Sequence, residues 1–159
     1  MILVVIYDEV DKVRISTRTR YGMRLMINLA RNYNNGYSLL KDVAKSESIS
    51  EKYLSLIVIP LKSAGFLNAI RGSHGGYCLS KPPSEIGIKD IIETTEGDLC
   101  LLECVKNKSA CTRSGNCVSR DLWLGLSNEI VEYLDSLTLE DIINMQNTKN
   151  EKLVNNYYI

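Results

Sequence analysis

Two short amphipathic helical patterns, followed at once by a glycine-rich hairpin, limit the fold of this 159-residue chain more than any other feature. The apolar positions recur at three- and four-residue spacing, which is the period of an α-helix with one buried face. They are Leu40, Val43 and Ala44 in the first pattern, and Leu54, Ile57, Val58 and Leu61 in the second. Two short helices joined by a tight turn, with the small Ala44 where they cross, predict a helix-turn-helix.

Serine residues mark where these two helices begin. Ser38 and Ser50 each precede an apolar pattern, and a serine hydroxyl accepts a hydrogen bond from a free N–H of a first helical turn. Pro60 falls late in the second pattern and lacks a backbone donor, so we expect that helix to bend or end early near Pro60. Gly65 closes the segment.

A basic hairpin follows directly. Residues 66–70 predict a strand, the stretch from Arg71 to Gly76 supplies the turn, and residues 77–79 predict the return strand, where Cys78 is expected to be a core residue. A hairpin in this place is the wing of a winged helix-turn-helix. The predicted fold class is therefore mainly α with a small β wing.

Further helical patterns flank this unit. Thr17 or Thr19 is expected to cap a helix that ends at Asn34-Asn35-Gly36, and residues 86–94 predict another helix. Residues 119–137 predict a long helix, and Thr138 is expected to cap a last short one. The long helix carries apolar residues at a period near 3.5: Trp123, Leu126, Ile130, Leu134 and Leu137. This spacing favours pairing with another helix, so we expect a C-terminal dimerisation helix.

Charge is distributed unevenly along a chain whose net charge is zero. Residues 13–85 hold 11 Lys and Arg against 4 Asp and Glu, whereas residues 86–159 hold 7 against 12. A basic first half and an acidic second half indicate a polyanion-binding module followed by a segment with another role.

The cysteines point to a second feature. No stretch reaches the roughly 18 apolar residues of a membrane span, and the opening MILVVIY is too short for a signal peptide, so we expect a cytoplasmic protein with reduced thiols. Cys104, Cys111 and Cys117 fall within 14 residues of a loop spanning residues 97–117. Three thiolates so close favour an iron–sulfur or other metal centre over packing. Zinc, and a metal-free loop that oxidises reversibly, are the alternatives.

Four segments of the chain resemble the Rrf2 family of bacterial winged-helix transcription regulators. They are Val13-Arg-Ile-Ser-Thr-Arg-Thr-Arg-Tyr-Gly-Met23, Ile49-Ser-Glu-Lys-Tyr-Leu54, Ile70-Arg-Gly-Ser-His-Gly-Gly-Tyr77 and Ser136-Leu-Thr-Leu-Glu-Asp141. The resemblance implies a homodimer whose long C-terminal helices pack together, and whose two winged units read a palindrome in double-stranded DNA. Family members usually begin with Met at the position of Val13, so residues 1–12 are expected to be an extension or the result of a misassigned start codon.

Candidate DNA contacts follow from the helix pattern, the wing and this resemblance. Outward residues of the second short helix are expected to meet base edges and phosphates, Arg71 to enter the minor groove, and Gly72 to let the backbone approach phosphate. Near the start of the first helix, arginines are expected to contact phosphate. The residues concerned are Ser50, Lys52, Tyr53 and Ser55, then Arg71 and Gly72, and finally Arg18 and Arg20. Some cluster-sensing relatives carry glutamate where this chain has Ser55, so their base preference does not transfer.

The family also has a branch that holds a 2Fe–2S cluster through three cysteines at nearly this spacing, which implies ligand roles for Cys104, Cys111 and Cys117. A histidine three residues after the last cysteine often completes that site, but this chain has Arg120 there. Another subgroup uses an acid where this chain has Arg20, and the only histidine, His74, lies in the wing. The remaining candidates for a fourth ligand are Cys100, Asp98, Glu103, Asp121 and a small external thiol.

The C-terminal residues Tyr158 and Ile159 suggest a partner. The family's repressor of cysteine metabolism has a similar ending, and cysteine synthase captures peptides that end in isoleucine. Docking of cysteine synthase on Ile159 is therefore one expectation, and a frayed or dimer-packed tail is the other.

We thus expect a domain order in which residues 13–85 form the DNA-binding domain and residues 86–117 a linking helix with the cysteine loop. Residues 118–146 form the dimerisation helix and a short helix, and residues 147–159 a tail. The chain shows no nucleotide-binding loop and no catalytic pair, so an enzyme is not expected. The predicted function is a dimeric regulator that senses iron–sulfur, redox or nitric oxide status. The alternatives are a cluster-free repressor of sulfur metabolism controlled by a bound enzyme, and a metal-binding protein whose winged helix contacts other proteins.

Overall fold

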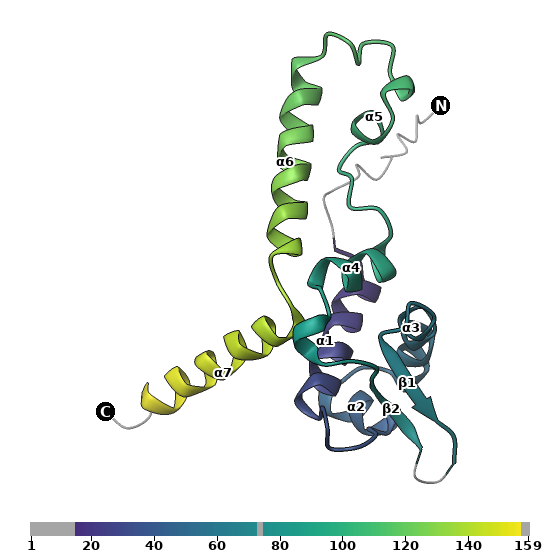
Figure 1. The fold of residues 1–159 in the computed structure, drawn as a ribbon, viewed down its shortest axis with the longest axis vertical. Coiled ribbons are helices and arrows are strands. Elements are labelled where there is room, and N and C mark those ends of the chain that lie inside the picture. The colour runs from purple at the N-terminus through teal and green to yellow at the C-terminus, as the bar shows by residue number, and fades with distance from the viewer. Residues whose placement is uncertain (1–14, 73–74, 157–159) are drawn as a thin grey trace, which may run out of the picture.

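The computed structural model describes residues 15–72 and 75–156 and shows a helical head from which two long helices extend in different directions (Figure 1). The head contains α1 (Thr17–Arg31), α2 (Leu40–Glu47), α3 (Glu51–Ser63), β1 (Leu67–Ile70), β2 (Gly76–Leu79), the 3-10 turn η1 (Pro83–Glu85) and α4 (Ile88–Glu96). The two long helices are α6 (Val118–Asp135) and α7 (Leu139–Asn156). The predicted fold class, mainly α with a small β wing, is confirmed.

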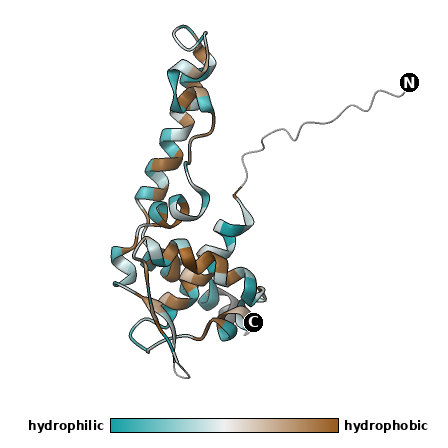
Figure 2. Cartoon of the chain, turned by 90° about the vertical axis from the view of Figure 1, so that its right-hand side faces the viewer, coloured by the Kyte–Doolittle hydropathy of each residue, from teal (hydrophilic) through white to brown (hydrophobic). Residues whose placement is uncertain are grey.

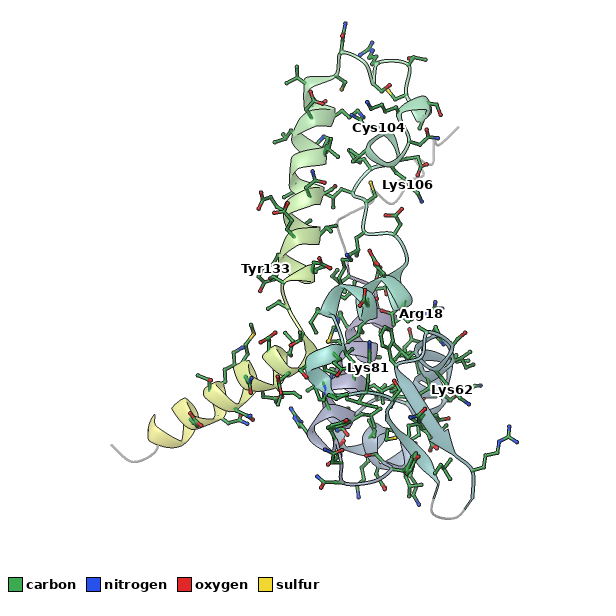
Figure 3. All side chains as sticks on the ribbon, viewed as in Figure 1. Arg18, Lys62, Lys81, Cys104, Lys106 and Tyr133 are labelled. Carbon is green, nitrogen blue, oxygen red and sulfur yellow. The ribbon has the colours of Figure 1, made fainter. Side chains whose placement is uncertain are left out.

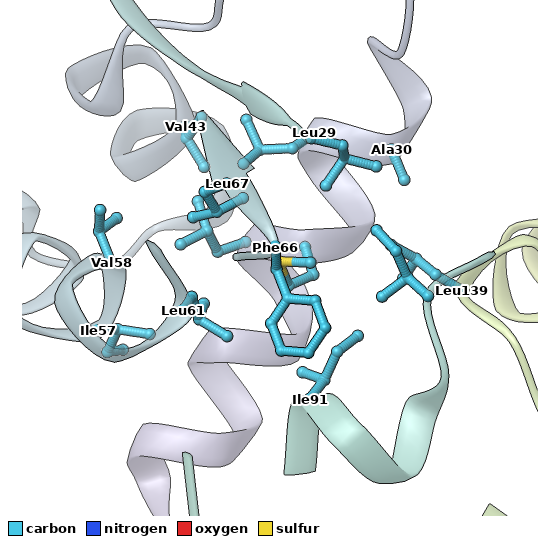
Figure 4. Close-up of a cluster of buried hydrophobic side chains, with 14 of the residues drawn as sticks. Leu29, Ala30, Val43, Ile57, Val58, Leu61, Phe66, Leu67, Ile91 and Leu139 are labelled. Carbon is cyan, nitrogen blue, oxygen red and sulfur yellow. The ribbon is translucent and has the colours of Figure 1, made fainter. Parts of the chain in front are cut away.

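One apolar cluster holds the head together (Figure 4). It joins α1, α3 and α4 to the wing and to the first residue of α7. Its fully buried members include Leu25, Met26, Leu54, Leu61, Ile86, Ile91 and Leu139. Burying a side chain of this size contributes about 1.5–3 kcal/mol, so the cluster supplies most of the driving force for folding the head.

The N-cap of helix α1 precedes both predicted caps, Thr17 and Thr19. Ser16 is its N-cap, and the Ser16 hydroxyl accepts a hydrogen bond from the Thr19 N–H at 3.2 Å. Thr17 and Thr19 lie inside the helix, so the prediction that either of them caps it was wrong. The helix ends at Asn32, before the expected turn at residues 34–36.

Helices α2 and α3 form the predicted helix-turn-helix. Ser48 takes a left-handed conformation with φ of 54°, and the Ile49 N–H donates to the Ala44 carbonyl at 2.9 Å, which turns the chain tightly between the helices. All four predicted inward residues of α3 are buried. Ser50 is the N-cap of α3 as predicted, although its side chain makes no capping hydrogen bond.

Two predicted helix ends differ from the structure. Ser38 does not cap α2, because its backbone instead forms a β-bridge with Tyr77, and Leu39 is the N-cap. Helix α3 does not end at Pro60 but continues to Ser63, and the Ala64 N–H donates to the Pro60 carbonyl at 2.9 Å. Burial of Leu61 beyond the proline explains why this last turn forms despite the missing donor.

The wing is an antiparallel pair in which Leu67 faces Leu79 and Ile70 faces Gly76. Ser38 adds a short third edge, because Ser38 and Tyr77 exchange both backbone hydrogen bonds at 2.9 Å. Gly76 permits this close approach, since a Cβ at that position would lie 2.4 Å from the Ser38 carbonyl oxygen. The wing is therefore attached to the start of α2, and its position is set by the helix-turn-helix. Cys78, expected in the core, is half-buried in β2.

Helices α4, α6 and α7 connect the head to the extended part of the chain. Gly87 and Thr138 form a second β-bridge. Its hydrogen bonds come from the flanking residues, and in one of them the Leu139 N–H donates to the Ile86 carbonyl at 2.8 Å. Thr138 caps α7 as predicted, since its hydroxyl accepts from the Asp141 N–H and its own N–H donates to the Asp141 carboxylate. The helix is not short, because it continues to Asn156 through most of the predicted tail.

Residues 97–117 contain a short helix α5 (Glu103–Lys106) and the 3-10 turn η2 (Lys108–Ala110), at the far end of α6 from the head (Figure 1). Among the helices described, none has the length and apolar character needed to cross a bilayer. The predicted extension of residues 1–12, His74 in the wing, and Tyr158 and Ile159 lie outside the described residues.

Candidate nucleic-acid interface and cysteine loop

The outward face of α3 carries the predicted contact residues together with two aliphatic ones. Lys52 and Ser55 are exposed, and so are Leu56 and Ile59, whose side chains are 57% and 64% exposed. The Ser55 hydroxyl donates to the Lys52 carbonyl at 2.7 Å, so its proton is used within the helix. The first two turns of this face therefore offer one cation, Lys52, and one exposed apolar side chain, Leu56, to a partner, while Ile59 lies about one turn further along the helix.

Tyr53 is held more firmly than its neighbours. Its half-buried ring packs edge-to-face against the Tyr21 ring of α1, with centroids 5.8 Å apart. The two rings form part of a groove of about 670 Å³ between the start of α1 and the first turns of α3. The groove is lined by Thr17, Tyr21, Ser48, Ile49, Ser50, Lys52, Tyr53 and Leu56. Hydroxyl groups, one ammonium and one exposed leucine thus surround a single concave surface.

Arg18 and Arg20 are exposed in the first turn of α1, and Figure 3 shows Arg18 on the same side of the head as Lys62 of α3. A carboxylate from a distant segment fixes this turn. Glu96, the last residue of α4, accepts the Ser16 N–H at 3.0 Å and also accepts the Thr19 hydroxyl. The orientation of the two arginines therefore depends on a residue 80 positions from Ser16.

These hydrogen bonds determine the ionisation of Glu96. Partial burial works to raise the pKa of its carboxyl, but the hydrogen bonds from Thr19 and Ser16 outweigh this effect and hold the pKa below its ordinary value. Glu96 is therefore an anion at neutral pH, next to the positive end of the α1 dipole.

The wing places Arg71 and Gly72 beyond the end of β1, and both are exposed. Gly72 has φ of +117°, a conformation that strains any residue with a Cβ, and no atom of the described residues beyond its chain neighbours lies within 4 Å of the place where a Cβ would be. The backbone at Gly72 is thus not covered by the described residues on the side where a Cβ would lie. Seen along the molecule, α3 and the wing lie at the end opposite to the cysteine loop (Figure 1).

The cysteine loop holds four half-buried thiols, Cys100, Cys104, Cys111 and Cys117. Cys117 is the N-cap of α6, and its sulfur lies 3.2 Å from the Ser119 hydroxyl. That hydrogen bond, together with the Arg120 backbone N–H, lowers the pKa of the Cys117 thiol. Asp98 is engaged elsewhere, because its carboxylate pairs with the Lys106 ammonium at 2.8 Å and accepts the Cys100 N–H at 2.9 Å.

Arg120 has an unexpected role in this loop. Its side chain is buried, at 7% exposure, and its Nε donates to the Cys104 carbonyl at 2.8 Å while Nη2 donates to the Val105 carbonyl. The guanidinium thereby holds α5 against α6. Figure 3 shows Cys104 at this end of the molecule, beside α6 and far from the head.

The loop supplies three thiols with the chemistry of iron–sulfur ligands, and of the candidates for a fourth ligand Cys100 is a free half-buried thiol in the same loop, whereas Asp98 pairs with Lys106. Three soft thiols on one short loop suit iron or zinc, but Arg120 takes the place where a histidine ligand would follow Cys117. Within residues 15–72 and 75–156, no three Cys, His, Asp or Glu side chains converge closely enough to hold a metal ion.

Helix α6 leaves a strip of apolar side chains exposed. Its members are Val118, Leu122, Trp123, Leu126 and Tyr133. The predicted seam is divided, because Leu134 and Leu137 pack against the core of their own head, whereas Trp123 and Leu126 are exposed. Exposed apolar strips of this kind mark interaction surfaces. Brown apolar segments along α6 are visible in Figure 2.

Two residues of this region, Glu96 and Leu56, carry no signal that sequence patterns could detect. In the sequence, Glu96 resembles any other acidic residue of a helix, because its hydrogen bonds to the start of α1 exist only in the folded chain. Leu56 falls just outside the apolar period of α3, and only its exposure beside Lys52 distinguishes it. The helical period identifies the buried residues of α3 but does not show which exposed residues contact a partner.

Comparison with known proteins agrees with this geometry. A family model, Rrf2, described as an iron-dependent transcriptional regulator, matches residues 15–145. The HTH-type transcriptional regulator CymR of Bacillus subtilis is 38% identical over 130 residues, which are 82% of this chain and 89% of CymR.

Two solved structures are similar over most of the chain. The structure of CymR, described as the global cysteine regulator of B. subtilis, matches with a TM-score of 0.72 at 37% identity and covers 83% of this chain and 97% of CymR. The structure of T. potens IscR matches with a TM-score of 0.69 at 32% identity, covering 84% of this chain and 88% of IscR.

Proposed function

The chain belongs to the Rrf2 family of transcriptional regulators, and from this premise we propose that it binds a palindromic operator in double-stranded DNA as a homodimer. The observation that carries the proposal is the placement of α3 and the wing on the head at the end away from the cysteine loop, with Thr17 and Tyr21 of α1 beside the first turns of α3. We also propose a cytoplasmic location, because that is where a bacterial regulator meets its operator.

Each predicted contact has a defined part in this proposal. Lys52, with Ser50, Tyr53 and Ser55, meets the major groove, because these residues lie on the first turns of α3. Arg71 enters the adjacent minor groove, while the Gly72 backbone approaches phosphate. Arg18 and Arg20 neutralise phosphates beside α3.

Salt dependence tests the DNA contacts. Binding of the protein to promoter fragments, followed by fluorescence anisotropy, should weaken in proportion to the number of neutralised phosphates, with a slope of about −0.9 per contact in a plot of log affinity against log salt. Arg18→Ala should weaken binding to all duplexes alike and reduce that slope by about 1. Affinity that does not change with salt contradicts the proposal.

The signal enters through the cysteine loop, and we propose that Cys104, Cys111 and Cys117 hold a 2Fe–2S cluster. The three soft thiols and the iron-dependent description of the family model support this ligand set. The cluster would supply reversible redox and nitric oxide chemistry. The chain's own part is to join the loop to α6 through Arg120, so that a change in the loop shifts the population of DNA-binding states.

An anaerobic purification tests the cluster directly. Visible charge-transfer bands with matching iron and sulfide contents are expected, and Cys111→Ser should abolish them. Zinc in a stoichiometric amount, or colourless protein with free thiols, would contradict the iron–sulfur assignment.

The similarity to the cysteine regulator of B. subtilis favours a second candidate, a cluster-free repressor of sulfur metabolism controlled by a bound enzyme. In that case cysteine synthase would bind the C-terminal residues Tyr158 and Ile159. Calorimetric titration with cysteine synthase tests it, because removal of the last two residues should abolish binding. Equal binding of the full-length and shortened chains would exclude that docking site.

A further inference from the structure

We propose that Leu56 reads thymine methyl groups in the operator. This assignment rests on the proposed function and adds a base preference to it. Leu56 is 57% exposed on the outward face of α3, one turn beyond Lys52, while its neighbours Leu54 and Ile57 supply the inward face. An aliphatic side chain in water forgoes the free energy that burial would release. Leu56 thus has surface to bury against a partner.

The groove beside α3 sets where that partner lies. Leu56 lines it together with Lys52 and Tyr53, and the Tyr53 ring is braced against Tyr21. The recognition helix of a helix-turn-helix contacts base edges through its N-terminal turns, and Leu56 is the sixth residue of α3. Leu56 therefore lies in the part of the helix from which recognition helices contact base edges.

The chemistry of the neighbouring side chains limits which group on the DNA Leu56 can contact. The hydroxyl of Ser55 donates to its own helix, so Ser55 has no proton to offer a base. An aliphatic group has one favourable target on the major-groove edge, the 5-methyl group of thymine. Leu56 would favour thymine at one position in each half-site.

Charge on the same surface favours DNA over a protein as the partner. Lys52 stands one turn away on α3, and Arg18 is exposed at the start of α1, whose Thr17 and Tyr21 line the same groove. Residues 13–85 as a whole hold 11 basic against 4 acidic residues. A polyanion complements this surface, and thymine methyl groups are the apolar groups that a duplex presents beside its phosphates.

Replacement of thymine by deoxyuridine tests the assignment, because it removes the methyl group alone. Duplexes are first selected from a random-sequence pool with the wild-type protein, and each thymine of the enriched half-site is then replaced in turn. At one thymine per half-site, replacement by deoxyuridine should lower the affinity of the wild type about fourfold. This is the loss expected when one buried methyl group is removed. Leu56→Ala should bind the thymine and deoxyuridine duplexes equally.

Ile59→Ala is the matched control. It removes an exposed aliphatic side chain from the same helix, but Ile59 does not belong to the groove lining, so this variant should keep the wild-type methyl dependence. Both variants should fold, as thermal unfolding would verify, because both side chains are exposed.

Several results would overturn the assignment while DNA binding itself stands. These are equal methyl dependence in the wild type and Leu56→Ala, loss of the dependence in Ile59→Ala as well, or a wild type indifferent to every replacement, as expected if Leu56 contacts a protein. Failure to enrich any duplex would instead overturn the proposed function, and the assignment with it.

Discussion

Arg71 and Glu96 are single side chains that act in different ways. Arg71 is exposed beyond β1 and has its effect only when a duplex is present. Glu96 acts within the folded chain, where it accepts hydrogen bonds from the N-cap of α1 and from Thr19. The first residue is therefore tested by binding and the second by stability.

Replacement of Arg71 should weaken operator binding. Arg71→Ala removes a guanidinium from the wing tip, and we expect a loss of about 1–3 kcal/mol of specific binding free energy with an unchanged melting temperature. Arg113→Ala is a suitable control, since it removes an exposed guanidinium from the cysteine loop at the other end of the molecule. Titration of a labelled operator at fixed salt measures the affinity of each variant. Equal affinities for Arg71→Ala and Arg113→Ala would show that Arg71 does not contact the operator.

Replacement of Glu96 should change how stability depends on pH. The pKa of Glu96 is lower in the folded than in the unfolded chain, so its contribution is complete above pH 4.5 and is lost as the pH falls through the folded value. Glu96→Gln keeps the shape but not the charge, and we expect it to reduce the free energy of unfolding by about 1–2 kcal/mol at pH 7.

Urea unfolding at pH 7 and at progressively lower pH measures this effect. The difference between wild type and Glu96→Gln should shrink below pH 4.5, whereas Glu93→Gln, an exposed substitution on the same helix, should differ little from wild type at any pH. A difference that stays constant with pH would show that the charge of Glu96 does not contribute.

At the scale of elements, the cysteine loop is joined to the rest of the chain by few contacts. Helix α5 is four residues long and has one buried residue, Val105. Arg120 of α6 donates to the carbonyl groups of Cys104 and Val105, so this one side chain attaches α5 to the long helix.

Removal of this side chain should loosen the loop selectively. Arg120→Ala leaves two carbonyl groups without their donor, and we expect a cost of about 1–3 kcal/mol confined to the loop. Amide hydrogen exchange should speed up at residues 103–106, while residues of α1 keep wild-type protection. Arg113→Ala serves here too, because that side chain is exposed. Unchanged exchange at residues 103–106 in Arg120→Ala would contradict the role of Arg120.

The described part of the molecule is extended, and residues 15–72 and 75–156 leave apolar surface on α6 uncovered. Leu122, Leu126 and Tyr133 are exposed along this helix, at 63%, 44% and 63%. A second copy of the chain would bury them, as the proposed homodimer requires. Tyr133 is labelled on the outer side of α6 in Figure 3.

A charge on this strip should separate the protomers. Leu126→Glu would place a carboxylate in the apolar contact, and we expect sedimentation analysis to show a monomer that binds the operator weakly, because each half-site is then bound singly. Asn128→Glu adds the same charge at another exposed position of α6 and should remain dimeric. A dimeric Leu126→Glu protein would place the interface elsewhere.

Local patterns were sufficient to predict the helix-turn-helix, the wing and the long helix α6. The inward residues of α3 follow from the helical period, and the hairpin follows from glycines between two apolar runs, so neither depends on distant parts of the chain. The four cysteines of residues 97–117 were also evident from the sequence, because their spacing is a property of the chain itself.

Tertiary structure decided which groups meet across long separations. Ser38 pairs with the wing instead of capping α2, Glu96 binds the start of α1, and Leu134 joins its own head instead of remaining free for a partner. In each case a backbone or side-chain group finds its partner through the packing of the core. The sequence specifies the period of each element, but the hydrogen bonds between elements depend on how the elements pack, and that is known only once the chain is folded.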